Sequence, residues 1–166
     1  CGCDVLISSR REEALKEAKA EIEETAAKGV KVCYFAGDAG DEATVIKMLE
    51  YTVSEDGIGG CDILVNAPGI NRKMWSYEMD IDFFEKMLKT NVTSMVLTCK
   101  HFGNWMKDHN LDGAEYQEHV PGNQNPNKGY GKIINIGSVR GIRIVGNGGM
   151  GNVAYNTTKG AVEMLT

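Results

Sequence analysis

Three side chains with complementary chemistry occur close together in the 166-residue sequence: Ser138, Tyr155 and Lys159. A phenol alone carries protons poorly at neutral pH, because its reference pKa is about 10. An ammonium group held beside a phenol favours the phenolate, and residues four apart on a helix share one face. The tyrosine and the lysine therefore suit general acid/base catalysis, provided that the serine hydroxyl holds the substrate oxygen. The alternative is that all three are ordinary turn and surface residues.

Strand and helix patterns alternate along the chain and position these residues. Short apolar runs predict strands at 4–8, 30–36, 61–66 and 132–137. Apolar residues at helical spacing predict helices at 12–28, 42–55, 81–107 and from 153 onward. Such alternation is typical of βαβ units, so we expect an α/β fold with a doubly wound parallel sheet. Ser138 then lies just past the carboxyl end of a strand, where open sheets of this class bind ligands.

Composition limits the class of partner. The chain has 18 Lys and Arg against 23 Asp and Glu, a net charge of -5 that argues against nucleic-acid binding. No apolar run approaches the roughly 18 residues needed to span a bilayer, and no leader pattern is visible. Five scattered cysteines indicate reduced thiols rather than a disulfide framework or a metal site. We therefore expect a cytoplasmic protein that acts on a small molecule.

Residues 108–129 form a polar stretch rich in Asn, Gly and Pro. The stretch is longer than a usual connection between a helix and a strand, so we interpret it as a surface insertion. Its histidines, His109 and His119, are expected to be solvated rather than to bind a metal. Neither an internal repeat nor a second domain is indicated, and residues 1–166 are expected to belong to one domain.

Four segments resemble, in order, the motifs of one enzyme family: Asp62-Ile-Leu-Val-Asn-Ala-Pro-Gly69, Lys89-Thr-Asn-Val92, Gly131-Lys-Ile-Ile-Asn-Ile-Gly-Ser138 and Tyr155-x-x-x-Lys159. On these motifs, which extend over nearly the whole chain, the sequence is similar to the short-chain dehydrogenase/reductase family. The resemblance implies a Rossmann-type sheet and hydride transfer between a nicotinamide dinucleotide and an alcohol or ketone. Residues 69–73 and 161–166 resemble the branch that acts on sugar acids, such as gluconate 5-dehydrogenases.

The resemblance implies a role for each catalytic candidate. Tyr155 would exchange a proton with the substrate oxygen, and Ser138 would hydrogen-bond that oxygen. Lys159 would favour the phenolate and hold the nicotinamide ribose. Asn91 would hold a water that links Lys159 to solvent; an amide on an apolar helix stripe needs a partner in any case. The alternative for Asn91 is a buried amide that satisfies nearby main chain.

The resemblance also assigns cofactor contacts. Sites of this kind that prefer NAD place an acid after the strand at 4–8, whereas an arginine accommodates the 2′-phosphate of NADP. This chain has Arg10 and Arg11 and no acid before Glu12, so NADP(H) is favoured over NAD(H), with Arg10 as the leading phosphate contact. The alternative is that both arginines are solvated. Asp38 would contact the adenine, or would be an ordinary residue at a helix N-terminus. The adenosine side of the groove would be lined by Asn66, Ala67 and Gly69.

The chain departs from the family pattern in three places. Asn66-Ala67-Pro68-Gly69 replaces Asn-Asn-Ala-Gly, the loop between Ser138 and Tyr155 is longer and glycine-rich, and the glycine-rich phosphate loop is missing. We therefore interpret the sequence as a fragment with strands 2 to 5 of the family fold. In the order 3-2-1-4-5-6 the missing strand lies between the second and the fourth. Its absence predicts two separate strand pairs with bare edges and a chain that folds poorly alone.

Two other functions remain compatible with the sequence. One is a related reductase of fatty-acyl, steroid or quinone carbonyls. The other is a catalytically silent module that binds dinucleotide; the joint presence of Ser138, Tyr155, Lys159 and Asn91 argues against it. A homodimer or homotetramer is implied by the family, and the helix at 81–107 fits because it is apolar on more than one side.

Overall fold

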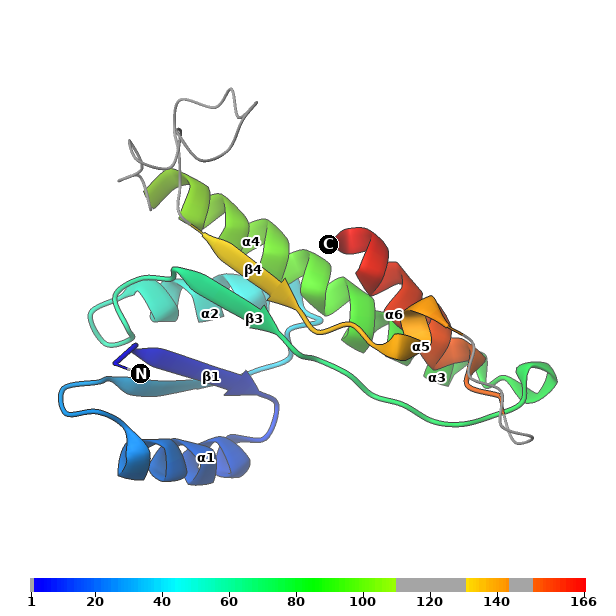
Figure 1. Ribbon diagram of the computed structural model, residues 1–166, viewed down its shortest axis with the longest axis horizontal. Coiled ribbons are helices and arrows are strands. Elements are labelled where there is room, and N and C mark those ends of the chain that lie inside the picture. Colours follow the sequence, from blue (N-terminus) through cyan, green and yellow to red (C-terminus); the bar gives the residue numbers. More distant parts are fainter. Residues whose placement is uncertain (1, 110–130, 144–150) are drawn as a thin grey trace.

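The computed structural model describes residues 2–109, 131–143 and 151–166 (Figure 1). Its strands are β1 (Val5–Ser9), β2 (Val32–Ala36), β3 (Ile63–Asn66) and β4 (Lys132–Asn135). Its α-helices are α1 (Glu12–Thr25), α2 (Glu42–Val53), α3 (Ile81–Leu88), α4 (Ser94–His109), α5 (Val139–Ile142) and α6 (Val153–Leu165). The alternation of strands and helices confirms the α/β fold class, and most ends agree with the sequence patterns within about three residues.

Some sequence predictions need comment. Nearly all of the expected insertion, with His119, lies outside the described residues, as do the glycines at 146–149. His109 was expected in a loop, but it ends α4 and stacks on Trp105, with 4.6 Å between ring centroids. The aromatic neighbour one turn earlier keeps this residue helical. The short helix α5 was not predicted, because four residues are too few to show a periodic pattern.

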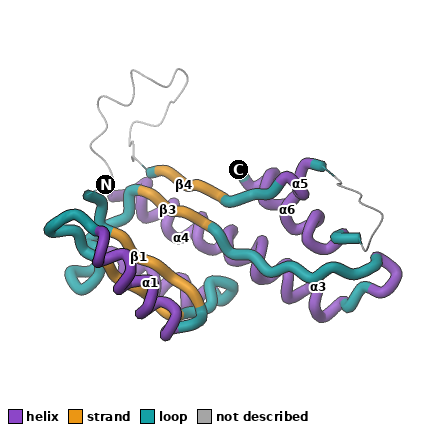
Figure 2. Tube along the Cα trace, turned by 60° about the horizontal axis from the view of Figure 1, so that its bottom comes forward, coloured by secondary structure: helices purple, strands orange, loops and turns teal. Residues whose placement is uncertain are grey.

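The four strands form two separate parallel pairs. β1 pairs with β2 from Val5 opposite Val32, and β3 pairs with β4 from Ile63 opposite Lys132. β1 and β3 are neighbours in both views (Figures 1 and 2), yet no ladder joins them among the described residues. A cleft of about 610 Å³, lined by residues 4–10 and 63–69 among others, lies between the two pairs. This arrangement is the one expected when the intervening strand is missing.

The β3–β4 pair is covered by helix on one face only. Side chains alternate between the two faces of a strand, and Leu64 on one face packs against the hydrophobic core. That core is formed by α2, α4 and the start of β3, with Val45, Met48, Cys61, Phe102 and Met106 buried. On the opposite face Ile63, Val65 and Ile134 are 56%, 55% and 48% exposed. This face of the β3–β4 pair is therefore apolar and largely exposed.

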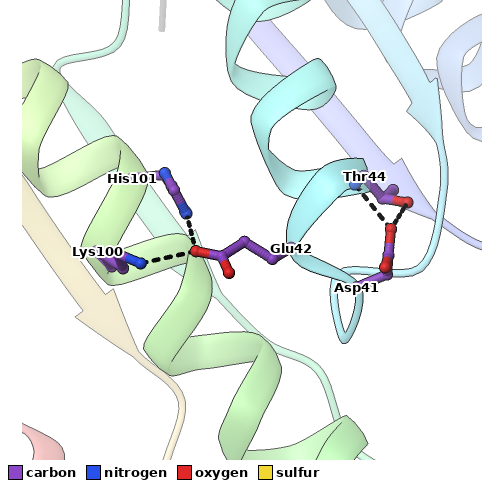
Figure 3. Close-up of polar contacts among 5 residues, drawn as sticks. All are labelled: Asp41, Glu42, Thr44, Lys100 and His101. Atoms are coloured by element: carbon purple, nitrogen blue, oxygen red, sulfur yellow. Dashed lines mark hydrogen bonds and ion pairs between the residues drawn. The ribbon is translucent and has the colours of Figure 1, made fainter.

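Polar contacts fix α2 against α4 (Figure 3). Asp41 caps α2: its Oδ2 accepts hydrogen bonds from the Thr44 amide at 2.9 Å and from the Thr44 hydroxyl at 2.6 Å. Glu42 accepts hydrogen bonds from Lys100 at 2.7 Å and His101 at 2.8 Å, and these lower the pKa of Glu42. A lowered carboxyl pKa stabilises the fold above the ordinary glutamate range, and the effect is lost as pH falls through the lowered value.

A buried polar cluster joins β3, β4 and α4. Asn66 and Asn135 are partners in the β3–β4 register, and the Asn66 Nδ2 donates to the Asn135 Oδ1 at 2.9 Å. The Thr98 hydroxyl of α4 donates to the Asn66 Oδ1 at 2.8 Å. A slip of one residue would turn Asn66 to the other face and break both bonds, so the cluster specifies the register. Within the described ranges, no helix has both the length and the apolar character needed to cross a membrane.

The substitution Asn66→Leu should destabilise the full-length protein by roughly 1–3 kcal/mol, because it leaves the buried partners of Asn66 without their hydrogen bonds. Urea unfolding followed by circular dichroism measures the change. The matched control is Asn104→Leu at an exposed position of α4. Equal destabilisation by the two substitutions would contradict the importance of the cluster.

The 166-residue chain by itself should melt over a broad temperature range and should bind no dinucleotide, since two strand edges and an apolar sheet face are uncovered. Differential scanning calorimetry with and without NADPH provides the test. A sharp, cooperative transition that NADPH moves upward would show that the two strand pairs are sufficient.

Candidate active site

The expected cofactor residues follow the carboxyl ends of three strands. Arg10 comes after β1 and Asp38 after β2, and residues 66–69 lie at the end of β3. The cleft between the strand pairs is lined by Arg10, Asp38, Asn66, Ala67 and Gly69, as predicted from the sequence. Arg11 does not line it; this residue is the exposed N-cap of α1. The structure thus brings together five of the six cofactor candidates that follow strands, whereas Lys159, expected to hold the nicotinamide ribose, does not line this cleft.

The cleft residues differ in what they can offer a ligand. The Arg10 side chain is exposed, and the Asp38 Oδ1 accepts a hydrogen bond from the Gly40 amide at 2.9 Å. Asn66 uses both ends of its amide in the β3–β4 cluster, which leaves the exposed Ala67 and Gly69 as open lining. A guanidinium and a carboxylate at one strand-end edge suit the ribose of an adenosine, with or without a phosphate. These residues therefore fit the adenosine half of a nicotinamide dinucleotide.

The acid/base pair lies on α6 as the sequence spacing predicts. Tyr155 and Lys159 are one turn apart, and the Lys159 Nζ is 5.9 Å from the centroid of the tyrosine ring. Lys159 is only 3% exposed, and its Nζ donates a hydrogen bond to the main-chain oxygen of Ile136 at 2.6 Å. Burial lowers the pKa of Lys159, and the nearby carboxylate of Glu163 opposes this shift. The lysine is thus held at the end of β4.

Ser138 lies where β4 leads into α5. Its hydroxyl oxygen accepts a hydrogen bond from the Arg140 amide at 3.2 Å and so caps the short helix. Its own amide donates to the Glu163 Oε1 at 3.3 Å. α5 lies along α6 in both views (Figures 1 and 2), and a Cβ at Gly141 would come within 2.6 Å of the Lys159 main-chain oxygen. Only glycine at position 141 permits this approach of α5 to α6.

Asn91 lies in a π-helical turn, Lys89–Thr93, that separates α3 from α4. The sequence predicted one continuous helix at 81–107, because apolar spacing does not report a single wider turn. Such turns are rare in proteins, and those that occur are often found at functional sites. Asn91 is fully buried, and its amide exchanges hydrogen bonds with the main chain of Ile70, at 2.8 Å and 3.0 Å.

The same amide reaches α6. The Asn91 Nδ2 donates to the Thr158 hydroxyl at 3.0 Å, and that hydroxyl donates to the main-chain oxygen of Tyr155 at 2.9 Å. Asn91 therefore satisfies nearby main chain and at the same time ties the π-helical turn to the tyrosine's own helical turn. The sequence analysis did not single out Thr158 or Glu163. Their spacing could have indicated them, because Thr158 is one helical turn after Tyr155 and Glu163 is one turn after Lys159.

The site has two parts in the described structure. The acid/base candidates, Ser138, Tyr155, Lys159 and Asn91, are joined by contacts among α5, α6 and the π-helical turn. The cofactor group lines the cleft beside β1 and β3, whose lining includes none of these four residues. Ser138 and the cofactor residues nonetheless all follow carboxyl ends of parallel strands.

Comparison with known proteins identifies the family. The family model described as short chain dehydrogenase matches residues 1–166. An uncharacterized oxidoreductase of Bacillus subtilis (strain 168) is 30% identical over 165 residues, which are 99% of this chain and 53% of that protein. A gluconate 5-dehydrogenase of Gluconobacter oxydans (strain 621H) is 28% identical over 165 residues, 99% of this chain and 54% of that protein.

Solved structures share the fold. NAD⁺-bound xylitol dehydrogenase superimposes with a TM-score of 0.76 at 27% identity over 98% of this chain and 52% of that one. The closed form of serine dehydrogenase complexed with NADP⁺ gives a TM-score of 0.73 at 25% identity over 99% and 54%. The chain spans about half the length of the curated relatives that it matches. Because the family model matches the whole chain and its fold is that of solved members, the chain belongs to the short-chain dehydrogenase/reductase family.

Proposed function

We propose that the protein transfers a hydride between NADP(H) and a secondary alcohol or ketone, with Tyr155 as the general acid/base. The observation that carries this proposal is the pair on α6, in which a buried ammonium group lies one helical turn from the tyrosine. Ser138 supports it, because the residue follows a parallel strand and its segment is bonded to the same helix. A lysine is almost never so buried unless it is paired, and Lys159 is paired with the segment that leads to Ser138.

The roles of the chain's own residues follow from these contacts. The dinucleotide, when bound, supplies or accepts the hydride. The Tyr155 phenol gives a proton to the carbonyl oxygen during reduction and takes it back during oxidation. An ammonium group has three donors, and the contact with Ile136 leaves two of the Lys159 donors for a ribose or the phenol. The Ser138 hydroxyl hydrogen remains available to the substrate oxygen, since its cap bond uses only the oxygen as acceptor.

Asn91 acts in this proposal by fixing where α6 begins. Its amide links the loop after β3 to Thr158, and Thr158 in turn bonds the main chain of Tyr155. Because both Nδ2 hydrogens already have partners, a water could contact the Asn91 side chain only as a second donor to Oδ1. Asn91 is thus proposed to orient the tyrosine.

NADP(H) is preferred over NAD(H) in this proposal because of Arg10. The guanidinium is exposed on the cleft at the end of β1, and a guanidinium pairs with a phosphate through two parallel hydrogen bonds. Structural neighbours have been solved with NAD⁺ and with NADP⁺, so the preference depends on this side chain rather than on the fold.

A polyhydroxylated substrate such as a sugar acid is the proposed substrate class. The likeness to gluconate 5-dehydrogenase and to xylitol dehydrogenase supports it. We also propose a cytoplasmic homodimer or homotetramer. Ile81 of α3 and Val96 of α4 are 59% and 42% exposed, so these helices retain apolar surface outside the core. The direct test of function is a screen of the full-length protein at 340 nm against sugar acids, polyols and ketones. Absence of turnover with every class would overturn the proposal.

The substitution Tyr155→Phe should lower kcat by about 10²–10⁴-fold, because it removes the proton that the mechanism transfers. The Kd of NADPH, measured by fluorescence titration, should stay within about twofold, since a phenol hydroxyl contributes little cofactor binding energy. Tyr34→Phe on β2 is the matched control and should retain full activity. Comparable turnover in the Tyr155 variant would refute the assignment.

The substitution Arg10→Ala should raise the Kd of NADPH by about 10-fold or more, because a charged hydrogen bond to phosphate contributes roughly 1.5–3 kcal/mol. The Kd of NADH should be nearly unchanged, and Arg11→Ala should have the smaller effect because Arg11 does not line the cleft. Lys19→Ala on α1 removes one positive charge elsewhere and serves as the control. An equal rise in the Kd of NADH and of NADPH would mean that Arg10 does not bind the 2′-phosphate.

A further inference from the structure

Two side chains of α6, and that of Thr166 at its C-cap, contact the segment that leads from β4 to Ser138. The Lys159 Nζ donates to the Ile136 oxygen at 2.6 Å, and the Glu163 Oε1 accepts from the Ser138 amide at 3.3 Å. One turn further along, the Thr166 hydroxyl accepts from the Asn135 Nδ2 at 3.2 Å. Positions 159, 163 and 166 lie on one face of the helix, so the three contacts form a continuous row. We call Lys159, Glu163 and Thr166 the α6 clasp.

Gly137 lies between the two main-chain groups that the clasp holds. A Cβ at this position would overlap the Glu163 carboxylate. The φ angle of Gly137 is not positive, so a side chain at this position would conflict only with the end of the Glu163 side chain and would displace it. The close approach of the carboxylate to residues 137–138 therefore depends on the absence of a side chain at position 137.

The Glu163 carboxylate also interacts with the charge of Lys159. Burial lowers the pKa of Lys159, and the charge of Glu163 raises it, so Glu163 favours the ammonium form that donates to Ile136. An ionised acceptor also makes a stronger hydrogen bond with an amide than a neutral one does. Both effects hold the end of β4 against α6.

We infer that Glu163 is a positioning residue that sets Ser138 relative to Tyr155 through the main chain of residues 136–138. The inference rests on the proposed catalytic role of Ser138. Glu163 itself is assigned no contact with substrate. The segment is short, because Ser138 lies between a four-residue strand and a four-residue helix. The Arg140 amide contacts its hydroxyl, and Glu163 holds its main-chain amide against α6.

The test compares four variants of the full-length protein. Glu163→Met removes both the acceptor and the charge. Glu163→Gln removes the charge but keeps an acceptor oxygen on a side chain of the same length. Gly137→Ala leaves Glu163 in place but displaces its carboxylate. Glu50→Met replaces an exposed glutamate of α2 and is the control. The measurements are kcat, the KM for each substrate, the melting temperature, and the hydrogen exchange rate of the Ser138 amide by NMR.

Glu163→Met and Gly137→Ala should each lower kcat by about 10–100-fold, the loss typical of a displacement of about 1 Å in a catalytic group. The KM for the dinucleotide should not change, and the Ser138 amide should exchange faster. Glu163→Gln should retain kcat within about threefold, because a neutral acceptor keeps the hydrogen bond at roughly half its strength. Rescue by Gln separates positioning from a general loss of stability.

Several results would overturn the inference. One is wild-type kcat and wild-type amide exchange in Glu163→Met. Another is an equal loss of kcat in the Gln and Met variants. A third is a loss of kcat that is fully explained by the fraction of each variant that is unfolded. If the wild-type protein shows no turnover, the proposed function fails instead, and the exchange rate of the Ser138 amide still decides whether the clasp exists.

Discussion

The burial of one ammonium group governs the arrangement around the proposed active site. A buried charge is unfavourable unless it is paired and hydrogen-bonded, and Lys159 meets this condition through the Ile136 oxygen and the nearby charge of Glu163. The bond to Ile136 requires α6 to lie against the end of β4. Tyr155 is one turn before the lysine, and Ser138 is two residues after the bonded carbonyl. One interaction therefore sets the positions of both.

A second constraint comes from the π-helical turn at Asn91. The wider turn places a fully buried amide where it bonds the loop after β3 on one side and Thr158 of α6 on the other. The Asn66–Asn135 pair joins the strands that carry these segments. β3, β4, the π-helical turn and α6 are thus connected by polar groups in the interior, where each unmet hydrogen bond would be costly.

The two strand pairs divide the proposed chemistry between them. Arg10 and Asp38 follow β1 and β2, whereas the acid/base residues are attached to β3 and β4. The cleft between the pairs has residues of both on its walls. A dinucleotide bound as proposed would extend from one pair to the other, so the relative position of the pairs matters for function as well as for stability.

Much of this molecule could be predicted from local sequence patterns. Apolar runs and helical spacing predicted the four strands, the main helices and the α/β class, because burial of alternate or every third to fourth residue is a local requirement. The type and spacing of Ser138, Tyr155 and Lys159 indicated the acid/base chemistry, since an i,i+4 pair on a helix needs no long-range information. The expected strand order also predicted the two separate pairs that the described residues form.

Other features depended on contacts between residues far apart in the chain. The π-helical turn, the approach of Glu163 to Ser138 and the division of the proposed cofactor residues between cleft and surface have no periodic signature. Each arises because a polar group on one element must find a partner on another, and the partner is chosen only when the elements pack. The sequence by itself determined which residues are proposed to do the chemistry. The tertiary structure decided how they are held, because directional bonds such as those of Asn91 and Lys159 exist only between packed elements.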